Sequence, residues 1–278
     1  MITISAFADE VSMNIEEQFM FLSTAGISSV ELRFIKGKNI VNLNKNEWIE
    51  IKNRMDSYRI QVSAIASPIG KSCITDNFEK EYTRFKKAVE LAELFETPFI
   101  RVFSYYPPEN EKIEDFRDEV MNRFRMKVSY LNGTGIIMVH ENESNIYGHS
   151  AINCLDLVET IGSPNLRIVY DPANFVWGES IPNNVEKCFP SLKDYVVHVH
   201  IKDWSIGNKE IGALPGEGNA QIELLIKELK QISYSGYLTL EPHLNSGGQF
   251  GGTTTIDQFQ KALFALRSLC GKYGLIEK

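Results

Sequence analysis

Cysteine is scarce in this chain, and no two cysteines are spaced as a pair. The sequence contains no CxxC motif. The four cysteines lie far apart, at Cys73, Cys154, Cys188 and Cys270. Scattered single cysteines in a chain of 278 residues are typical of reduced core residues in a cytosolic protein. A disulfide framework is therefore excluded.

Long apolar runs are also absent. No stretch approaches the roughly 20 apolar residues that a membrane-spanning helix needs. The N-terminus reaches Asp9 and Glu10 after one short strand-like run, which is too early and too acidic for a secretory signal peptide. The sequence therefore predicts a soluble, cytoplasmic protein that does not enter a membrane.

An excess of positive charge is missing as well. The formal net charge is -7, from 29 basic and 36 acidic residues, and the two signs are interleaved. Binding to a polyanionic backbone needs a basic stripe. We therefore expect no nucleic-acid partner. Linkers and low-complexity segments that would divide the chain are absent too.

Short β-branched and apolar runs alternate with segments of helical period. The runs begin at Ile2, Ser28, Ile60, Pro98, Gly135, Leu166, Tyr195 and Tyr237. Between them lie amphipathic patterns such as the one that begins at Ile15 and stops at Gly26, and a last helix is expected over Ile256 to Cys270. Strand starts recur about every thirty residues, the size of a βαβ unit. This pattern predicts an α/β fold, a (β/α)8 TIM barrel with residues 1–278 as a single domain.

The segment from Tyr195 to Trp204, YVVHVHIKDW, has two unlike faces at the two-residue period of a strand. One face is apolar, and the other carries His198, His200 and Lys202. In a closed barrel this second face would point inward, with His200 and Lys202 nearest the mouth. Similar groups are then expected at the ends of the neighbouring strands.

Three other strands end in a carboxylate at the inward position. These are Glu141 in VHENE, Asp171 in VYDPANF and Glu241 in LEPH. One such group alone would be read as a cap or a salt-bridge partner, but four consecutive strands deliver one each. Clustered carboxylates repel one another unless a cation lies among them. The sequence therefore predicts one divalent metal ion held by Glu141, Asp171, His200 and Glu241, with Mn²⁺ as the first choice and Co²⁺, Mg²⁺ or Zn²⁺ as alternatives.

The motifs VHENE, YDPANF, HVHIKD, GEG and LEPH, in this order, resemble the xylose-isomerase-like TIM-barrel superfamily of sugar phosphate isomerases and epimerases. The similarity covers nearly the whole chain but does not specify a reaction. In the ketose 3-epimerases of this superfamily, the four metal ligands match the four residues above. The resemblance also implies that Glu141 and Glu241 act as the acid/base pair.

Two positions depart from those epimerases. Asn174 replaces a substrate-binding histidine three residues after the aspartate, which makes a plain 3-epimerase substrate pose doubtful. Lys202 and Asp203 follow His200 in an HxKD run that resembles inosose-dehydratase-like members.

The expected chemistry is proton transfer at a carbon next to a carbonyl, assisted by the metal ion. Returning the proton to the opposite face epimerises the substrate, and returning it to the adjacent carbon isomerises it, whereas loss of a β-hydroxyl dehydrates it. The first choice is a sugar or sugar phosphate isomerase/epimerase, with an inosose-dehydratase-like lyase as the alternative. A non-catalytic sugar- or metal-binding barrel and an endonuclease-IV-like phosphodiesterase are weaker alternatives, the latter because only five histidines exist.

Further side chains share the inward phase near the mouth. We expect substrate contacts from Glu31, Arg101, Asn174 and Lys202, although Glu31 could equally form an ion pair with Arg33 or Arg101 at the barrel floor. The expected partner is a small sugar or polyol, and the chain could form a homo-oligomer. Two glycine-rich loops, Trp204 to Asn219 and Asn245 to Thr255, should lie at the mouth, and the first is expected to act as a lid.

Overall fold

The computed structural model describes residues 1–208, 210–247 and 251–278. The strands are β1 (Thr3–Ala6), β2 (Ser29–Leu32), β3 (Phe34–Ile35), β4 (Lys38–Asn39), β5 (Gln61–Ala66), β6 (Phe99–Val102), β7 (Ile137–Glu141), β8 (Leu166–Tyr170), β9 (Val196–Ile201) and β10 (Tyr237–Leu240). The α-helices are α1 (Ile15–Thr24), α2 (Lys45–Tyr58), α3 (Phe78–Leu94), α4 (Arg117–Leu131), α5 (Ala151–Ile161), α6 (Pro172–Trp177), α7 (Asn184–Lys187), α8 (Phe189–Leu192), α9 (Ile222–Gln231) and α10 (Ile256–Tyr273). Short 3₁₀ helices are η1 (Ala8–Glu10), η2 (Ile40–Asn42), η3 (Ile113–Phe116) and η4 (Tyr147–His149).

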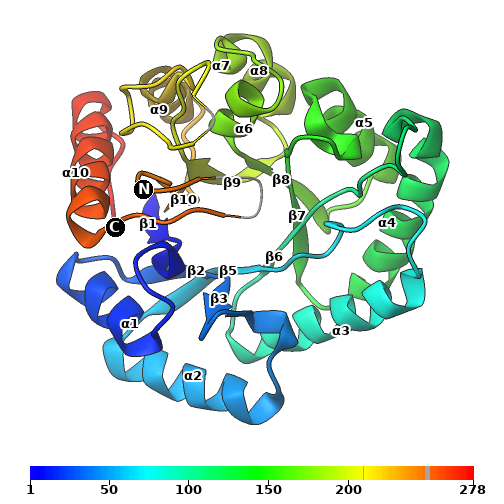
Figure 1. Ribbon diagram of the computed structural model, residues 1–278, viewed down its shortest axis with the longest axis horizontal. Helices are drawn as coiled ribbons and strands as arrows, with labels where there is room; N and C mark the ends of the chain where they lie inside the picture. Colours follow the sequence, from blue (N-terminus) through cyan, green and yellow to red (C-terminus); the bar gives the residue numbers. More distant parts are fainter. Residues whose placement is uncertain (209, 248–250) are drawn as a thin grey trace.

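Eight of the strands close into one parallel barrel in the order β1-β10-β9-β8-β7-β6-β5-β2. Every neighbouring pair in this ring is parallel, and the helices surround it (Figure 1). The two chain ends meet beside β1, where the backbone N–H of Ile2 donates to Ile276 and that of Lys278 donates to Ile2. The predicted (β/α)8 TIM barrel is confirmed, and all eight expected strands are present.

The barrel interior is polar below its mouth. Ser5 of β1 and Ser63 of β5 face each other across it, with hydroxyl oxygens 2.7 Å apart. His198 Nε2 lies 2.7 Å from the hydroxyl oxygen of Thr239, on the neighbouring strand β10. His198 and His200 are both fully buried. The polar face of the Tyr195–Trp204 segment therefore points inward, as predicted.

Helix ends follow local sequence signals. The Asn44 side chain begins α2 by accepting from two backbone N–H groups, one of which belongs to Glu47, whose carboxylate accepts from Asn44 N in return. Gly162 ends α5 in the left-handed region, at φ 61°. The last helix begins at Ile256 as predicted but continues three residues past Cys270.

The inner face of α5 consists of Cys154, Leu157 and Val158, whereas Leu155 and Ile161 are only half-buried. The two-stranded hairpin of β3 and β4 next to the mouth was not foreseen.

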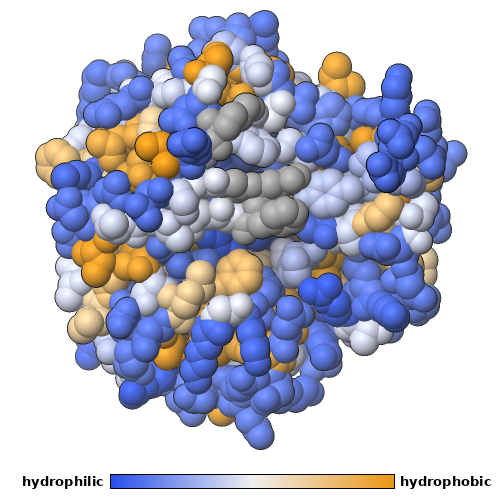
Figure 2. All heavy atoms as spheres, in the orientation of Figure 1, coloured by the Kyte–Doolittle hydropathy of each residue, from blue (hydrophilic) through white to orange (hydrophobic). Residues whose placement is uncertain are grey.

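The outer surface is mostly polar. Figure 2 shows hydrophilic side chains over most of the face in view, with hydrophobic ones in small separate groups. None of the helices in the described parts of the chain has the length and apolar character needed to cross a bilayer.

Candidate active site

Four buried side chains converge at the carboxyl ends of β7 to β10. Glu141 is the last residue of β7, Asp171 follows β8, His200 lies in β9 and Glu241 follows β10. One ligand atom from each lies within 4.8 Å of the other three. His200 Nδ1 is 3.2 Å from Glu141 Oε1, 3.7 Å from Asp171 Oδ2 and 3.7 Å from Glu241 Oε2. The structure thus brings together the four residues that were predicted as metal ligands.

Three oxygens of this cluster are buried without a hydrogen bond. They are Glu141 Oε2, Asp171 Oδ2 and Glu241 Oε2. An unsatisfied buried acceptor costs about 1–3 kcal/mol, and more when it is charged. Their nearest cationic atoms are Arg101 Nη1, 3.3 Å from Glu141 Oε2, and Lys202 Nζ, 2.9 Å from Asp171 Oδ2 and 3.5 Å from Glu241 Oε2. Three open carboxylate oxygens beside one imidazole nitrogen fit a divalent cation with oxygen and nitrogen ligands.

The local sequence explains why Asp171 presents only one oxygen to this cluster. Asp171 caps α6, and its Oδ1 accepts from the backbone N–H of Asn174 at 3.0 Å. Pro172 occupies the first turn of that helix, where its missing N–H is not needed. One oxygen therefore anchors the helix, and the other remains available to a cation.

Asn174 acts on Glu141. Its Nδ2 donates to Glu141 Oε1 at 3.2 Å and to the Asn142 carbonyl at 2.9 Å. Asn174 is only 7% exposed and is not among the residues that line the cavity. The side-chain amide of Asn174 donates to two acceptors within the protein, Glu141 and the Asn142 carbonyl, and its predicted substrate contact stays a prediction.

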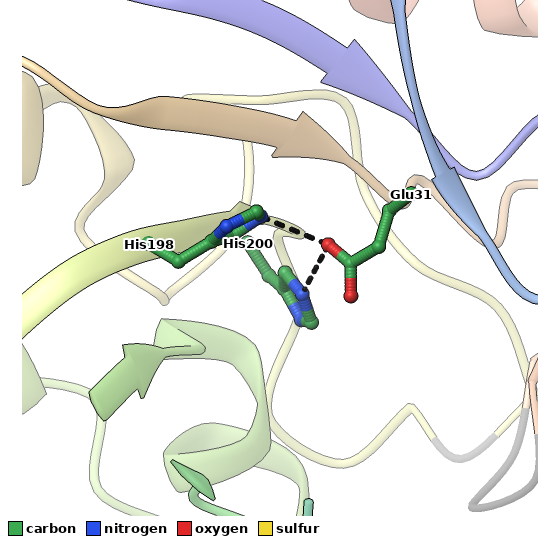
Figure 3. Close-up of side chains that lie close together, drawn as sticks. All are labelled: Glu31, His198 and His200. Carbon is green, nitrogen blue, oxygen red and sulfur yellow. Dashed lines mark hydrogen bonds and ion pairs between the residues drawn. The ribbon is translucent and has the colours of Figure 1, made fainter. Parts of the chain in front are cut away.

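Glu31 lies behind His200. Its Oε2 is 3.1 Å from His200 Nε2 and 2.9 Å from His198 Nε2, and Figure 3 shows both rings directed at this oxygen. Glu31 is fully buried and is not among the residues that line the cavity, and its predicted substrate contact stays a prediction. The alternative prediction, an ion pair between Glu31 and Arg101, agrees better with the structure, since Arg101 Nη1 lies 3.9 Å from Glu31 Oε1. By holding Nε2–H, Glu31 leaves Nδ1 of His200 facing the three carboxylates.

Charge pairing decides the ionisation of these groups. Burial raises the pKa of Glu141, but His200 and Arg101 outweigh burial and lower that pKa to about 2. For Glu241, burial is likewise outweighed by Lys202 and His243, so its pKa falls well below the usual range. Burial lowers the pKa of His200, yet Glu31 and Glu141 raise it well above its usual range. Both glutamates are therefore ionised at neutral pH and can accept a proton.

A carboxylate that orients a metal-ligating histidine raises metal affinity. We expect Glu31→Gln to weaken binding of Mn²⁺ by about 10- to 100-fold, because the amide carbonyl accepts from His200 Nε2 without the negative charge. Competition with a chromophoric chelator measures this affinity. Glu81→Gln, a change in another buried glutamate that pairs with Lys127 outside the barrel, is the matched control. An unchanged affinity in Glu31→Gln would show that Glu31 does not support the site.

Glu241 has a second set of partners that was not foreseen as a unit. Its Oε1 accepts from Arg33 Nη1 at 2.6 Å and lies 3.3 Å from His243 Nε2. Arg33 in turn donates through Nε to Asp9 at 2.8 Å, and His243 Nε2 lies 3.3 Å from Glu10 Oε1. The sequence signals for this network were Arg33 and the acidic pair Asp9 and Glu10, which lies in η1 shortly after β1. These contacts fix one oxygen of Glu241 and direct the other toward His200.

A cavity of about 190 Å³ opens over the cluster. Glu141, Glu241, Arg101 and Lys202 all line it, as predicted for residues at the mouth. The sequence interpretation missed two further charged residues of the lining, Lys71 and Glu143, because they lie in irregular loops. The full lining is Arg33, Phe34, Asn39, Pro68, Lys71, Arg101, Phe103, Glu141, Glu143, Lys202, Glu241, His243 and Gly251.

The loop after β9 is fastened to the barrel by Asp203. Its Oδ2 accepts from Gly216 N and Gly218 N at 2.9 Å each, and its Oδ1 accepts from Ala220 N at 3.0 Å and Trp204 N at 2.8 Å. A Cβ at Gly218 would lie 2.2 Å from Asp203 Oδ1, so only glycine fits there. The GEG motif is thus a fixed turn, and any lid movement is restricted to the segment before it.

Parts of both glycine-rich loops lie outside the described residues. These are Lys209 in the first loop and Gly248, Gln249 and Phe250 in the second. The described parts of the two loops are joined, because Gly212 N donates to His243 O at 2.9 Å and Gly247 N donates to Glu210 O at 2.7 Å. The lid remains a prediction.

Comparisons with known proteins agree with this architecture. The 3-dehydroshikimate dehydratase of Bacillus anthracis is 25% identical over 183 residues, which are 65% of this chain and 63% of that protein, so the chain spans less than two thirds of that relative's length. The solved structure of the 3-keto-D-glucoside 4-epimerase of E. coli superposes with a TM-score of 0.74 at 16% identity, covering 96% of this chain and 100% of that one.

A xylose isomerase-like TIM barrel protein from Mycobacterium smegmatis, solved in complex with magnesium, gives a TM-score of 0.73 at 13% identity, covering 98% of this chain and 97% of that one. These two structures, at such low identity, show a shared fold. The family model described as "Xylose isomerase-like TIM barrel" matches residues 19–268 of this chain. The chain therefore belongs to the xylose isomerase-like TIM barrel family.

Proposed function

We propose that this protein is a divalent-metal-dependent enzyme that transfers a proton at a carbon next to a carbonyl, and so isomerises or epimerises a sugar or sugar phosphate. The convergence of Glu141, Asp171, His200 and Glu241, with three carboxylate oxygens left open, carries this proposal. Arg101 and Lys202 offset part of the negative charge of this buried cluster, and a divalent cation bound by the open oxygens would offset more of it. The solved relative that contains magnesium adds support from the same fold.

The side chains of the cluster divide the work. Glu141, Asp171, His200 and Glu241 would hold the cation, which when bound would polarise a substrate carbonyl. Glu141 and Glu241 arrive from β7 and β10, and both line the cavity. Both are ionised at neutral pH, so either can remove a proton from the carbon next to the carbonyl, and the other can return it from its own side. Lys202 lines the same cavity and can donate to a substrate oxygen.

Dehydration is the second candidate function. It begins with the same proton removal, but the β-hydroxyl then takes up a proton and leaves as water, so that a carbon–carbon double bond forms and no proton returns to the carbon. Asn174 favours it, since this residue orients Glu141 instead of reaching the cavity as a substrate-binding histidine would. The similarity in sequence to a 3-dehydroshikimate dehydratase also favours it.

A phosphodiesterase with several metal ions fits less well. Such an enzyme would need further ligands at the ends of β5 and β6, where this chain has Ser67 and Ser104. The Ser67 hydroxyl donates to the Arg101 carbonyl, and the Ser104 hydroxyl lies 2.9 Å from His140 Nε2 and accepts from Gly148 N. Both hydroxyl groups therefore have structural partners.

Turnover of a small set of ketoses, ketose phosphates and cyclic keto-polyols tests the proposal. The purified chain is assayed with added Mn²⁺ and again after chelation, and the products are identified by NMR. Metal-dependent interconversion at one carbon supports isomerisation or epimerisation, whereas a new conjugated double bond supports dehydration. Turnover that persists after complete chelation, in parallel with elemental analysis, would contradict metal dependence.

Metal binding should release a proton. Without a cation His200 is protonated at neutral pH, because Glu31 and Glu141 raise its pKa. A metal ligand must be a neutral imidazole, so the apparent affinity for Mn²⁺ should rise about tenfold per pH unit until the pKa of His200 is reached. Calorimetric titrations in two buffers of different ionisation enthalpy count the protons released. A heat that does not depend on the buffer would contradict ligation by His200.

A further inference from the structure

Arg101 has hydrogen-bond donors that the protein does not use. It lies in β6, is 6% exposed and lines the cavity. Its Nε is buried without a partner among the described residues. Its Nη1 forms ion pairs, at 3.3 Å to Glu141 Oε2 and at 3.9 Å to Glu31 Oε1. A guanidinium carries five N–H donors, and leaving one of them buried and unpaired is costly.

The other arginine at the mouth is different. Arg33 donates through Nε to Asp9 at 2.8 Å and through Nη1 to Glu241 at 2.6 Å. Arg33 is therefore held by two carboxylates of the protein, whereas the Nε of Arg101 is a buried donor without a partner among the described residues. A ligand oxygen on the side of the cavity next to Glu141 could accept a hydrogen bond from Arg101.

A second cation stands beside Arg101. Lys71 Nζ lies 4.4 Å from the centre of the Phe103 ring, and Arg101 Cζ lies 5.0 Å from the same centre. Lys71 is paired with Glu143 at 3.1 Å, and all four residues line the cavity. Two cationic side chains thus share one aromatic ring at the same wall.

The positive wall continues outward. A neighbouring groove of about 430 Å³ shares Pro68 and Lys71 with the central cavity. It adds Lys80 and Arg84 of α3, together with two carboxylates, Asp76 and Glu81, the second of which is paired with Lys127. Lys71 lies where the two spaces join, so a substituent that leaves the central cavity on this side passes a basic surface.

From these contacts we infer that the substrate carries an oxyanion, a carboxylate or a phosphate, which binds to Arg101 with Lys71 alongside. This inference rests on the proposed function for the location of the reacting carbon and adds the class of substrate. A carboxylate or phosphate presents two oxygens that match the paired N–H groups of a guanidinium. Because Arg101 Nη1 lies 3.3 Å from Glu141 Oε2, the anionic group would be held close to the carboxylate that exchanges the proton.

Three pyranoses that differ at one carbon test the inference. They are glucose, which is neutral, glucuronate, which carries a carboxylate, and glucose 6-phosphate. Their binding is measured by ligand-observed NMR with Mg²⁺ present and again after chelation. We expect at least one of the two anionic sugars to bind about 10- to 100-fold more tightly than glucose, and the better of the two identifies the oxyanion.

Variants assign the preference to Arg101. Arg101→Gln should remove the preference for the anionic sugar, Arg101→Lys should keep part of it, and Lys71→Gln should reduce it severalfold. Lys45→Gln, which removes a charge at an exposed site paired with Glu90, is the matched control and should retain the full preference. If Arg101→Gln fails to fold, a weaker preference in Arg101→Lys than in the parent still tests whether the paired N–H groups of the guanidinium bind the anion.

Equal affinity for glucose and both anionic sugars in the parent chain would overturn the inference. A preference that survives Arg101→Gln would also overturn it. Metal binding by the same samples, measured by chelator competition, keeps the two proposals apart. If the chain binds Mg²⁺ but shows no preference for anionic sugars, the proposed function stands and this inference is wrong. If it prefers anionic sugars but binds no Mg²⁺, the anion site stands and the metal-dependent function is wrong.

Discussion

Glu141→Gln and Glu241→Gln are each expected to lower turnover by about 10² to 10⁴-fold, the range that a positioned general base contributes. In free energy this is about 3 to 5 kcal/mol of transition-state stabilisation. The amide keeps an oxygen in place but cannot accept the proton. Each variant should also change the isotope pattern, because one face of the substrate carbon loses its base.

Turnover in D₂O reads out this step directly. The parent chain should place solvent deuterium at the carbon next to the carbonyl, and each variant should slow that exchange together with turnover. Asp156→Asn is the control for the loss of an ion-paired carboxylate, since Asp156 pairs with Arg117 at 2.7 Å and does not line the cavity. Product formed without deuterium uptake would point to hydride transfer between carbons, and the proton-transfer roles of Glu141 and Glu241 would then be wrong.

Asp171→Asn and His200→Asn should remove the metal site. We expect the parent to retain about one divalent ion per chain after desalting, and each variant to bind Mn²⁺ more than about 100-fold more weakly, since loss of a supporting group alone costs 10- to 100-fold. Asp171→Asn is informative because an asparagine still caps α6 through its side-chain oxygen, so helix loss is avoided.

Elemental analysis and chelator competition measure both changes. His149→Ala is the matched control, because His149 also contacts two carboxylates, Glu114 and Glu179, at 3.1 Å each, but lies away from the cluster. Full metal occupancy in Asp171→Asn or His200→Asn would place the cation elsewhere. The adjoining group of Glu10, Glu241 and His243 would then be the site to examine.

The fold could be predicted because barrel strands carry a strong periodic signal. In β9 the alternation of Val197 and Val199 with His198 and His200 marks which side faces inward, and a closed barrel leaves one inner side for all strands. The same alternation identified Glu141 and Glu241 as inward residues at strand ends. For these positions, the alternation along the strand and the place of the strand in the barrel together determine where the side chain lies.

The partners of these residues could not be predicted in the same way. Lys71 and Glu143 come from loops without a period, so nothing in the sequence predicts that they pair with each other and that Lys71 lies beside Phe103. Glu31 was in the correct phase, but only the register of the strands shows that it meets His198 and His200 behind the site. The hydrogen bond from the Asn174 amide to Glu141 is likewise visible only in the structure. Such contacts depend on three-dimensional distances between segments far apart in the chain.

The anchoring of the β9 loop by Asp203 has a consequence for how this barrel can diversify. The Asp203 carboxylate accepts from four backbone N–H groups, those of Trp204, Gly216, Gly218 and Ala220. These bonds hold the end of the loop against its beginning and do not involve the side chains of the segment between Trp204 and Gly216. The intervening segment can therefore change in length and composition while the register of β9 and the start of α9 stay fixed. Loop exchange at this position offers a route to new substrate preferences on an unchanged catalytic frame, in the laboratory or during divergence of the gene.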